Sequence, residues 1–158
     1  MSVNKFLVVL IAVLGIASTA NAASKDRELS VDGNYIDTDD RSASLLNVSL
    51  GQFVTPQFSV VTALTTQRNF GYTATTIGLG GKYFFMDGFK GDLVPFAGIG
   101  IGLRLRESSQ GSTQYDFNGG LAYFLSDSTT LDAKLKLLTF TDSTPHVRLF
   151  TAGFSLRF

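Results

Sequence analysis

The sequence contains no cysteine, a single histidine and no excess of charge of either sign. Without cysteine the chain has no disulfide scaffold, no thiolate metal site and no lipid-modified terminal cysteine. Basic and acidic residues number 13 each, so there is no positive field to attract nucleic acid. The chain also has no phosphate-binding loop or nucleotide fingerprint, and we therefore predict no cofactor, no metal and no nucleic-acid partner.

The start of the chain predicts a secretory signal peptide. Lys5 precedes an apolar run from Phe6 to Ala17, and small and polar residues follow as far as Ala20-Asn21-Ala22, the expected cleavage site. The apolar run of about 12 residues is shorter than the roughly 20 that a transmembrane helix needs, which favours cleavage over anchoring. We expect residues 1-22 to be removed and residues 23-158 to form one exported domain.

From Arg27 onward no long stretch keeps apolar residues at helical spacing, and apolar and polar residues alternate between turn signals. This pattern predicts an all-β domain with an even number of strands. Each run has about ten to thirteen residues, close to what a tilted strand needs to cross a bilayer. Short connections indicate antiparallel hairpins. The eight expected strands are 27–37, 43–54, 57–67, 73–86, 93–106, 113–125, 129–141 and 147–158.

The two faces of these strands differ. In the strand 129–141, leucine and alanine occupy one face, and Asp132, Lys134 and Lys136 occupy the other. An apolar exterior around a polar lumen is typical of an up-and-down transmembrane β-barrel of the outer membrane. Only a closed barrel pairs every backbone group of a sheet in lipid. The predicted lumen charges are Asp32, Lys82, Arg104, Asp116, Asp132, Lys134 and Lys136.

The predicted lumen has little free space, because an eight-stranded barrel is about wide enough for side chains alone. We interpret the lumen charges as an ion-paired plug, with a solute path as the alternative. Inward glycines on three consecutive strands remove side-chain volume. We favour sharp curvature, or filling by Phe53, Phe84 or Phe124, over a groove or channel. The glycines are Gly78, Gly80, Gly98, Gly100, Gly102 and Gly120.

The last strand resembles the C-terminal signal that the barrel assembly machinery reads on outer-membrane proteins. The hairpin of the segments 80–85 and 94–102 is similar to the matching region of the small barrel family that contains OmpX, OmpW and the OmpA membrane domain. The resemblance spans the mature chain and implies an outer-membrane location in contact with lipid and lipopolysaccharide, but this family has many roles. We expect a monomer. The residues of the signal are Phe150, Phe154, Leu156 and Phe158.

The sequence leaves three functional hypotheses. The first is a non-enzymatic barrel with a structural or interaction role and a mostly closed lumen, and the second is a narrow channel or carrier for small or apolar solutes. The third is a lipid A-modifying enzyme with His146 as a general base near Asp142 and Ser143. We rank it last, because the histidine two positions before serine that lipid A deacylases carry is absent and such loop neighbours are common. Outer loops of about five to seven residues argue against adhesion.

Overall fold

The computed structural model describes residues 26–38, 41–69, 72–87, 91–106, 109–142 and 146–158. The predicted signal peptide and its cleavage site lie outside these ranges and stay predictions. No helix among the described residues is long and apolar enough to span a membrane.

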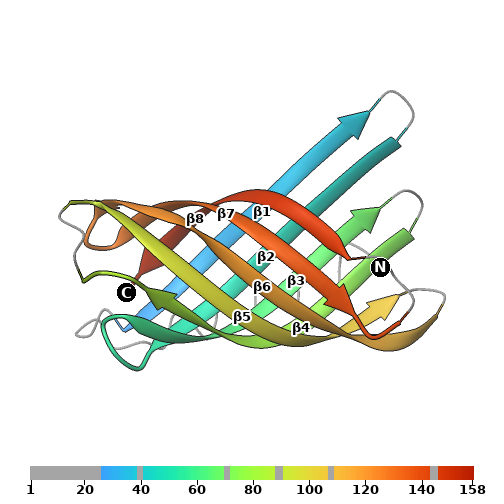
Figure 1. Ribbon diagram of the computed structural model, residues 1–158, viewed down its shortest axis with the longest axis horizontal. Helices are drawn as coiled ribbons and strands as arrows, with labels where there is room; N and C mark the ends of the chain where they lie inside the picture. Colours follow the sequence, from blue (N-terminus) through green and yellow to red (C-terminus); the bar gives the residue numbers. More distant parts are fainter. Residues whose placement is uncertain (1–25, 39–40, 70–71, 88–90, 107–108, 143–145) are drawn as a thin grey trace.

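Eight antiparallel β-strands follow one another in chain order and close into a barrel (Figure 1), which confirms the predicted fold class. The closure is made by β1 and β8, which pair from Glu28↔Arg157 to Gly33↔Ala152. The strands are β1 (Arg27–Thr38), β2 (Arg41–Phe53), β3 (Phe58–Asn69), β4 (Tyr72–Phe84), β5 (Leu93–Arg106), β6 (Ser109–Ser126), β7 (Thr129–Phe140) and β8 (Val147–Arg157).

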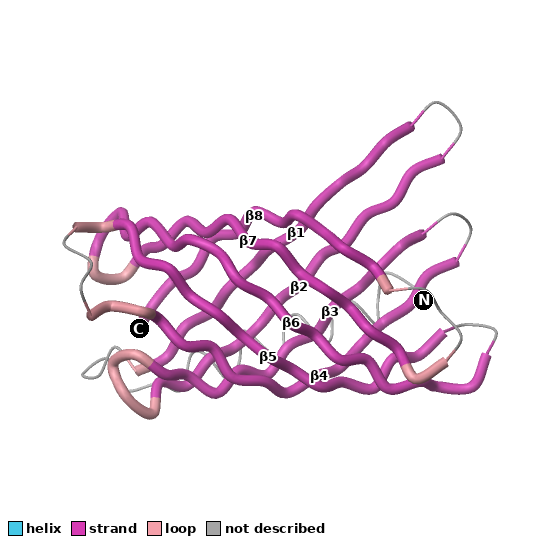
Figure 2. Tube along the Cα trace, in the orientation of Figure 1, coloured by secondary structure: helices cyan, strands magenta, loops and turns pink. Residues whose placement is uncertain are grey.

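We call the end of the barrel where β1 begins and β8 ends the base, and the opposite end the rim. Three of the four rim connections are shorter than the sequence predicts, because the strands continue into the expected loops. β1 reaches Thr38 and β2 starts at Arg41, β3 reaches Asn69 and β4 starts at Tyr72, and β6 starts at Ser109. The β1–β2 ladder runs unbroken to Thr38↔Arg41, and this hairpin rises beyond the neighbouring wall (Figure 2).

The alternation in the sequence decides which side chains face the lumen. In β7, Asp132 and Lys134 are buried, whereas Leu135 between Lys134 and Lys136 is 67% exposed. Leucine, isoleucine and phenylalanine are exposed along β4 to β8 in the same manner. Such a continuous apolar surface suits lipid, and the buried face carries the charges, as expected of a membrane barrel.

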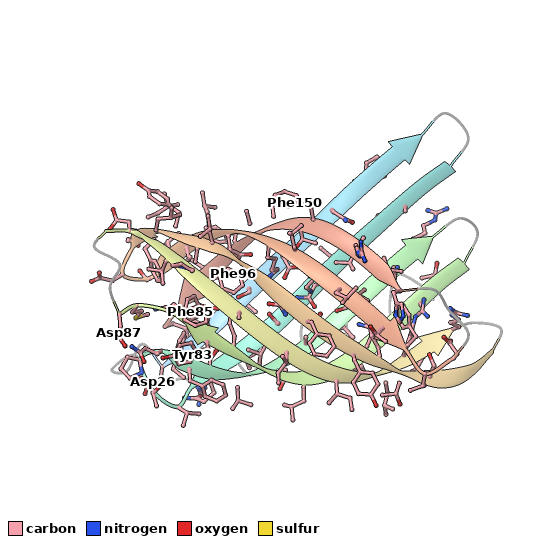
Figure 3. The ribbon with its side chains drawn as sticks, in the orientation of Figure 1. Asp26, Tyr83, Phe85, Asp87, Phe96 and Phe150 are labelled. Atoms are coloured by element: carbon pink, nitrogen blue, oxygen red, sulfur yellow. The ribbon has the colours of Figure 1, made fainter. Side chains whose placement is uncertain are left out.

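Aromatic residues lie on the outer surface near the base (Figure 3). The rings of Tyr83 and Phe85 meet edge to face, with centroids 5.1 Å apart. The Tyr83 hydroxyl lies 2.9 Å from Gln57 Oε1, and Gln57 Nε2 donates to Asp87 Oδ2 at 3.0 Å. A ring on the apolar side with its hydroxyl among polar groups is the arrangement that aromatic residues favour at a membrane interface.

The lumen is packed in three zones. A base cluster and a rim cluster of apolar side chains lie at its two ends, and most of the buried charges lie between them. The base cluster consists of Phe84, Val94, Phe96 and Ala122 with Phe53, Met86 and Phe124 packed against them. The rim cluster consists of Leu45, Leu138 and Phe140 with Val147 and Leu149 packed against them.

Candidate functional site

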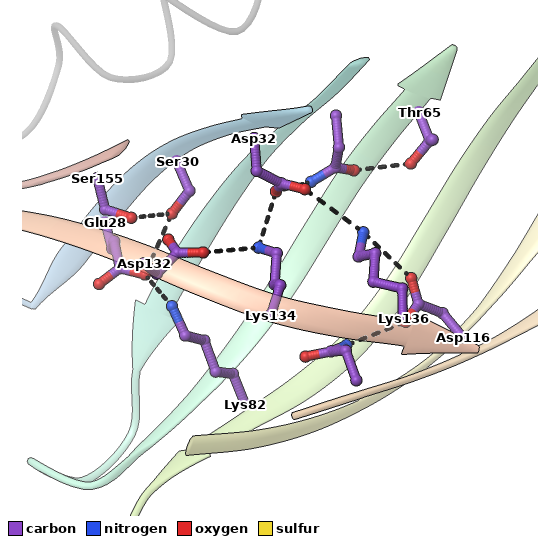
Figure 4. Close-up of polar contacts among 12 residues, drawn as sticks. Glu28, Ser30, Asp32, Thr65, Lys82, Asp116, Asp132, Lys134, Lys136 and Ser155 are labelled. Carbon is purple, nitrogen blue, oxygen red and sulfur yellow. Dashed lines mark hydrogen bonds and ion pairs between the residues drawn. The ribbon is translucent and has the colours of Figure 1, made fainter. Parts of the chain in front are cut away.

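The middle of the lumen holds a network of ion pairs that joins β1, β6 and β7 (Figure 4). Lys134 Nζ lies 2.9 Å from Asp32 Oδ2 and 3.3 Å from Asp132 Oδ1. Lys136 Nζ lies 3.7 Å from Asp32 Oδ1 and 3.4 Å from Asp116 Oδ2. The structure thus brings together five of the predicted lumen charges, and we call these five residues the central network.

Neutral amides and hydroxyls extend the central network to other strands. Asn47 Nδ2 donates a hydrogen bond to Asp32 Oδ2 at 2.8 Å, and the Thr65 hydroxyl donates to Asn47 Oδ1 at 2.7 Å. Within β6, Asn118 Nδ2 donates to Asp116 Oδ1 at 3.0 Å. Because a buried charge is costly unless it is paired and hydrogen-bonded, these contacts help to compensate the burial of the Asp32 and Asp116 side chains.

A second charge cluster lies at the base and centres on Glu28, which is 3% exposed. Lys82 Nζ lies 2.9 Å from Glu28 Oε1, and Arg157 Nε donates to Glu28 Oε2 at 3.1 Å. We call Glu28, Lys82 and Arg157 the basal ion-pair cluster. The predicted residue Lys82 therefore belongs to this cluster and not to the central network. Glu28 and Arg157 were not among the predicted sites, although both continue the inward phase of Asp32 and Ser155 to the strand ends.

The cations of the basal ion-pair cluster are packed against the aromatic rings of the base cluster. Lys82 Nζ lies 4.6 Å from the ring centroid of Phe84 and 4.8 Å from that of Phe96. The guanidinium carbon of Arg157 lies 4.5 Å from the Phe53 centroid, 5.1 Å from Phe84 and 4.8 Å from Phe124. Cation–π contacts of this kind hold a desolvated cation by about 2 kcal/mol or more.

Arg104 faces the lumen but lies apart from the central network. Its Nη1 is 4.0 Å from Asp142 Oδ2, and Arg106 Nη2 is 3.8 Å from the same oxygen. The guanidinium carbon of Arg104 lies 4.2 Å from the ring centroid of Phe140 in the rim cluster. Arg104 reaches this position because it is near the rim end of β5, whereas the central network lies at mid-height.

The charges of the central network and the basal ion-pair cluster balance. Among the described residues they comprise four carboxylates and four cations, each within ion-pair distance of an opposite charge. Removing one member of a buried pair leaves an uncompensated charge, at a cost of about 3–5 kcal/mol. The carboxylates are Glu28, Asp32, Asp116 and Asp132, and the cations are Lys82, Lys134, Lys136 and Arg157.

A cavity of about 100 Å³ lies beside the central network, along the glycines of β4 and β5. It has room for several water molecules and is lined by polar groups that could hydrogen-bond them. Its wall includes Gly78, Gly80, Gly98, Gly100 and Gly102, whereas Gly120 does not line it. Phe53, Phe84 and Phe124, which the sequence offered as fillers of this space, pack in the base cluster instead.

Close approach of β4 and β5 requires glycine at the wall of this cavity. Gly102 pairs with Gly78, and a Cβ on Gly102 would lie 2.7 Å from Thr76 Cγ2 and 2.9 Å from the carbonyl oxygen of Ile77. A Cβ on Gly100 would meet nothing closer than 3.4 Å. The glycines therefore serve both tight strand packing and the cavity, which the sequence treated as alternatives.

The residues of the enzyme hypothesis do not form a triad among the described residues. His146 is exposed, the Asp142 carboxylate lies beside Arg104 and Arg106, and Ser143 is outside the described residues. Within the described part of the chain, no group of three His, Cys, Asp or Glu side chains is placed to hold a metal ion.

The predicted C-terminal signal lies on the outer face of β8. Phe150, Phe154 and Leu156 are 62%, 40% and 42% exposed. The backbone N–H of Phe158 donates to the carbonyl of Arg27 at 3.0 Å, which ties the chain end to the first strand. Recognition of these residues by the assembly machinery stays a prediction.

No model of a protein family matches the sequence, and no curated protein matches it. Neisserial surface protein A (NspA) matches in structure with a TM-score of 0.70 and 16% identity, over 87% of this chain and 100% of that one. The N-terminal β-barrel domain of Pseudomonas aeruginosa OprF has a TM-score of 0.62 and 20% identity, over 84% and 96%. The outer membrane enzyme PagL has a TM-score of 0.50 and 11% identity, over 82% and 98%.

These likenesses establish the fold, which is that of small outer-membrane β-barrels. The fold and the exposed apolar surface together assign the chain to the outer membrane, in agreement with the sequence. Identities this low do not transfer an activity, and PagL is an enzyme of the same fold, so the fold does not decide whether this protein is one.

Proposed function

We propose that the protein is a non-enzymatic outer-membrane barrel with a structural or interaction role, whose lumen is held closed by its own side chains. The balanced set of buried ion pairs in the central network and the basal ion-pair cluster carries this proposal. An ion that enters the lumen would have to displace these pairs. Separating buried, desolvated ion-pair partners has a high free-energy cost.

The apolar clusters at the two ends support the same function. The phenylalanines of the base cluster surround Arg157, and the rim cluster occupies the lumen near the opposite end. Apolar constrictions exclude ions by removing the water that would hydrate them. A solute would therefore meet three obstacles in series, and we infer that the resting barrel does not conduct.

Ionic conductance in planar bilayers tests this proposal. The refolded mature chain should be silent, and a Lys134→Ala, Lys136→Ala variant should show openings because Asp32 and Asp132 lose their partners. The matched control is Leu135→Ala, Leu137→Ala, which changes the outward residues of the same strand and should stay silent. A heat-modifiable shift on gels verifies that each variant is folded. Discrete openings in the parent chain would contradict the closed lumen.

A second candidate function is a narrow channel or carrier, favoured by the cavity along the glycines of β4 and β5. If the parent chain conducts, the path should follow this cavity, and Gly100→Val should reduce the conductance by filling it. Gly100 is suited to this test because a Cβ at that position meets only ordinary van der Waals contacts. An unchanged conductance in this variant would exclude the cavity as the path.

A further inference from the structure

The ladder that closes the barrel is incomplete. It contains six residue pairs and ends at Gly33↔Ala152, whereas the β7–β8 ladder contains ten. Beyond this point the residues Asn34–Thr38 pair only with β2, and Val147–Thr151 pair only with β7, within the described part of the chain. The β1–β2 hairpin leans away from β8 there (Figures 1 and 2). We call these two segments the open edges.

One side-chain contact spans the gap where the open edges begin. Asn34 Nδ2 donates to the carbonyl oxygen of Phe150 at 3.2 Å, in a place where a continued ladder would have backbone bonds. Behind the gap, Leu149 packs against the rim cluster, which fills the lumen between β2 and β7. At the gap, β8 is therefore held by its ladder with β7 and by its packing on the rim cluster.

The lower part of the gap lies within the apolar surface. Phe150 is opposite Leu135 of β7, and both side chains are strongly exposed. Tyr35 of β1 is 68% exposed on the same outer face. Unpaired backbone groups at this level are costly, because acyl chains offer no hydrogen bonds. The open edges therefore need a partner that supplies backbone donors and acceptors, which a β-strand does and a lipid chain does not.

We propose that the partner is a second copy of this chain, with the open edge of β1 in one copy pairing with the open edge of β8 in the other. Two copies inserted in the same direction are related by a twofold axis along the membrane normal, so β1 and β8 of different copies run antiparallel, as they do within one barrel. Continuing the register of the closed part places Tyr35 opposite Phe150. Aromatic pairs are favourable at such positions.

The proposal replaces the monomer that the sequence predicts, and it does not depend on whether the lumen conducts. The absence of cysteine makes the test clean. A Tyr35→Cys chain and a Phe150→Cys chain, carrying different tags, are co-expressed in the outer membrane and oxidised. Paired antiparallel residues have Cα atoms about 4.5–5.5 Å apart, within disulfide range. We expect a disulfide-linked heterodimer that contains both tags.

The control uses the closed part of the ladder, where Val31 pairs with Phe154. Separate Val31→Cys and Phe154→Cys chains should give no heterodimer, and one chain carrying both substitutions should give an internal disulfide. An internal disulfide in a Tyr35→Cys, Phe150→Cys chain, with no heterodimer in the mixture, would mean that the edges close within one barrel and would overturn the proposal. No disulfide in either case would overturn it as well.

The mass of the unsubstituted chain in lipid nanodiscs gives a second readout if a cysteine variant fails to fold. The proposal requires a dimer that persists on dilution into a large excess of nanodiscs. A mass of one chain per disc under all conditions would contradict it.

Discussion

Glu28 on the first strand and Arg157 on the last strand form an ion pair at the base of the barrel, with Arg157 Nε 3.1 Å from Glu28 Oε2. The pair fastens β1 to β8 at the end where their ladder is complete. Arg157 is held at the same time among the rings of Phe53, Phe84 and Phe124. This arginine therefore links the closure of the wall to the packing of the lumen.

Replacing Arg157 should destabilise the barrel strongly. Arg157→Gln removes one of the two cations that neutralise Glu28 and the cation–π contacts, and we expect a loss of about 3–5 kcal/mol in the free energy of unfolding. Urea titration in lipid vesicles, followed by the heat-modifiable gel shift, measures this quantity. Arg148→Gln is the matched control, because Arg148 is exposed on the same strand and its loss should change the free energy by less than about 0.5 kcal/mol. Equal effects of the two substitutions would argue against the role of Arg157.

The outer face should reject charge because it contacts lipid. Leu135→Arg places a cation on the exposed apolar surface of β7 and should cost about 2–4 kcal/mol if the residue lies near the bilayer midplane. The same substitution on a water-exposed surface would be nearly neutral. Leu135→Ala is the control for lost side-chain volume. The free energy of unfolding in vesicles distinguishes the two environments.

A methyl group at the wall of the cavity should destabilise the barrel at one glycine of β5 and have little effect at the next. Gly102→Ala forces a Cβ against Thr76 Cγ2 and the Ile77 carbonyl, and overpacking of this kind costs about 1–3 kcal/mol. Gly100→Ala meets ordinary contacts and should have little effect. Comparing urea midpoints of the two variants checks the prediction. If Gly102→Ala is as stable as the parent chain, β4 and β5 do not approach as closely as described.

Removal of the single histidine should leave lipid A unchanged. His146 is exposed and the neighbouring Asp142 is beside two arginines, so no imidazole–carboxylate pair that could activate a serine is assembled among the described residues. Mass spectra of lipid A from cells that express the parent chain, the His146→Ala variant or neither protein should be identical. Lipid A that changes with the parent chain and reverts with the variant would establish the enzyme hypothesis and remove the non-enzymatic proposal.

The sequence predicts the strands and their two faces well, because both depend on local alternation. The inward positions of Asp132, Lys134 and Lys136 follow from the period of two alone. Glu28 and Arg157 were missed because they lie at strand ends, where few neighbouring residues fix the phase. Strand tilt and stagger decide which charges meet across the lumen, and a single strand carries no record of either.

The open edges could not be predicted for a similar reason. Nothing in the composition of Asn34–Thr38 or Val147–Thr151 distinguishes these residues from a paired strand. Leu149 of β8 packs on the rim cluster, which combines Leu45 of β2 with Leu138 and Phe140 of β7. Contacts of this kind appear only when strands far apart in the sequence are assembled.

The distances along the chain between the ion-pair partners limit how the barrel can fold. Lys134 is 102 residues after Asp32, and Arg157 is 129 residues after Glu28. An N-terminal half of the chain would carry its carboxylates without the cations that neutralise most of them, and it could not insert into lipid at an acceptable cost. Folding should therefore be slow and all-or-none, and the first strands should stay at the membrane surface until the last hairpin has formed.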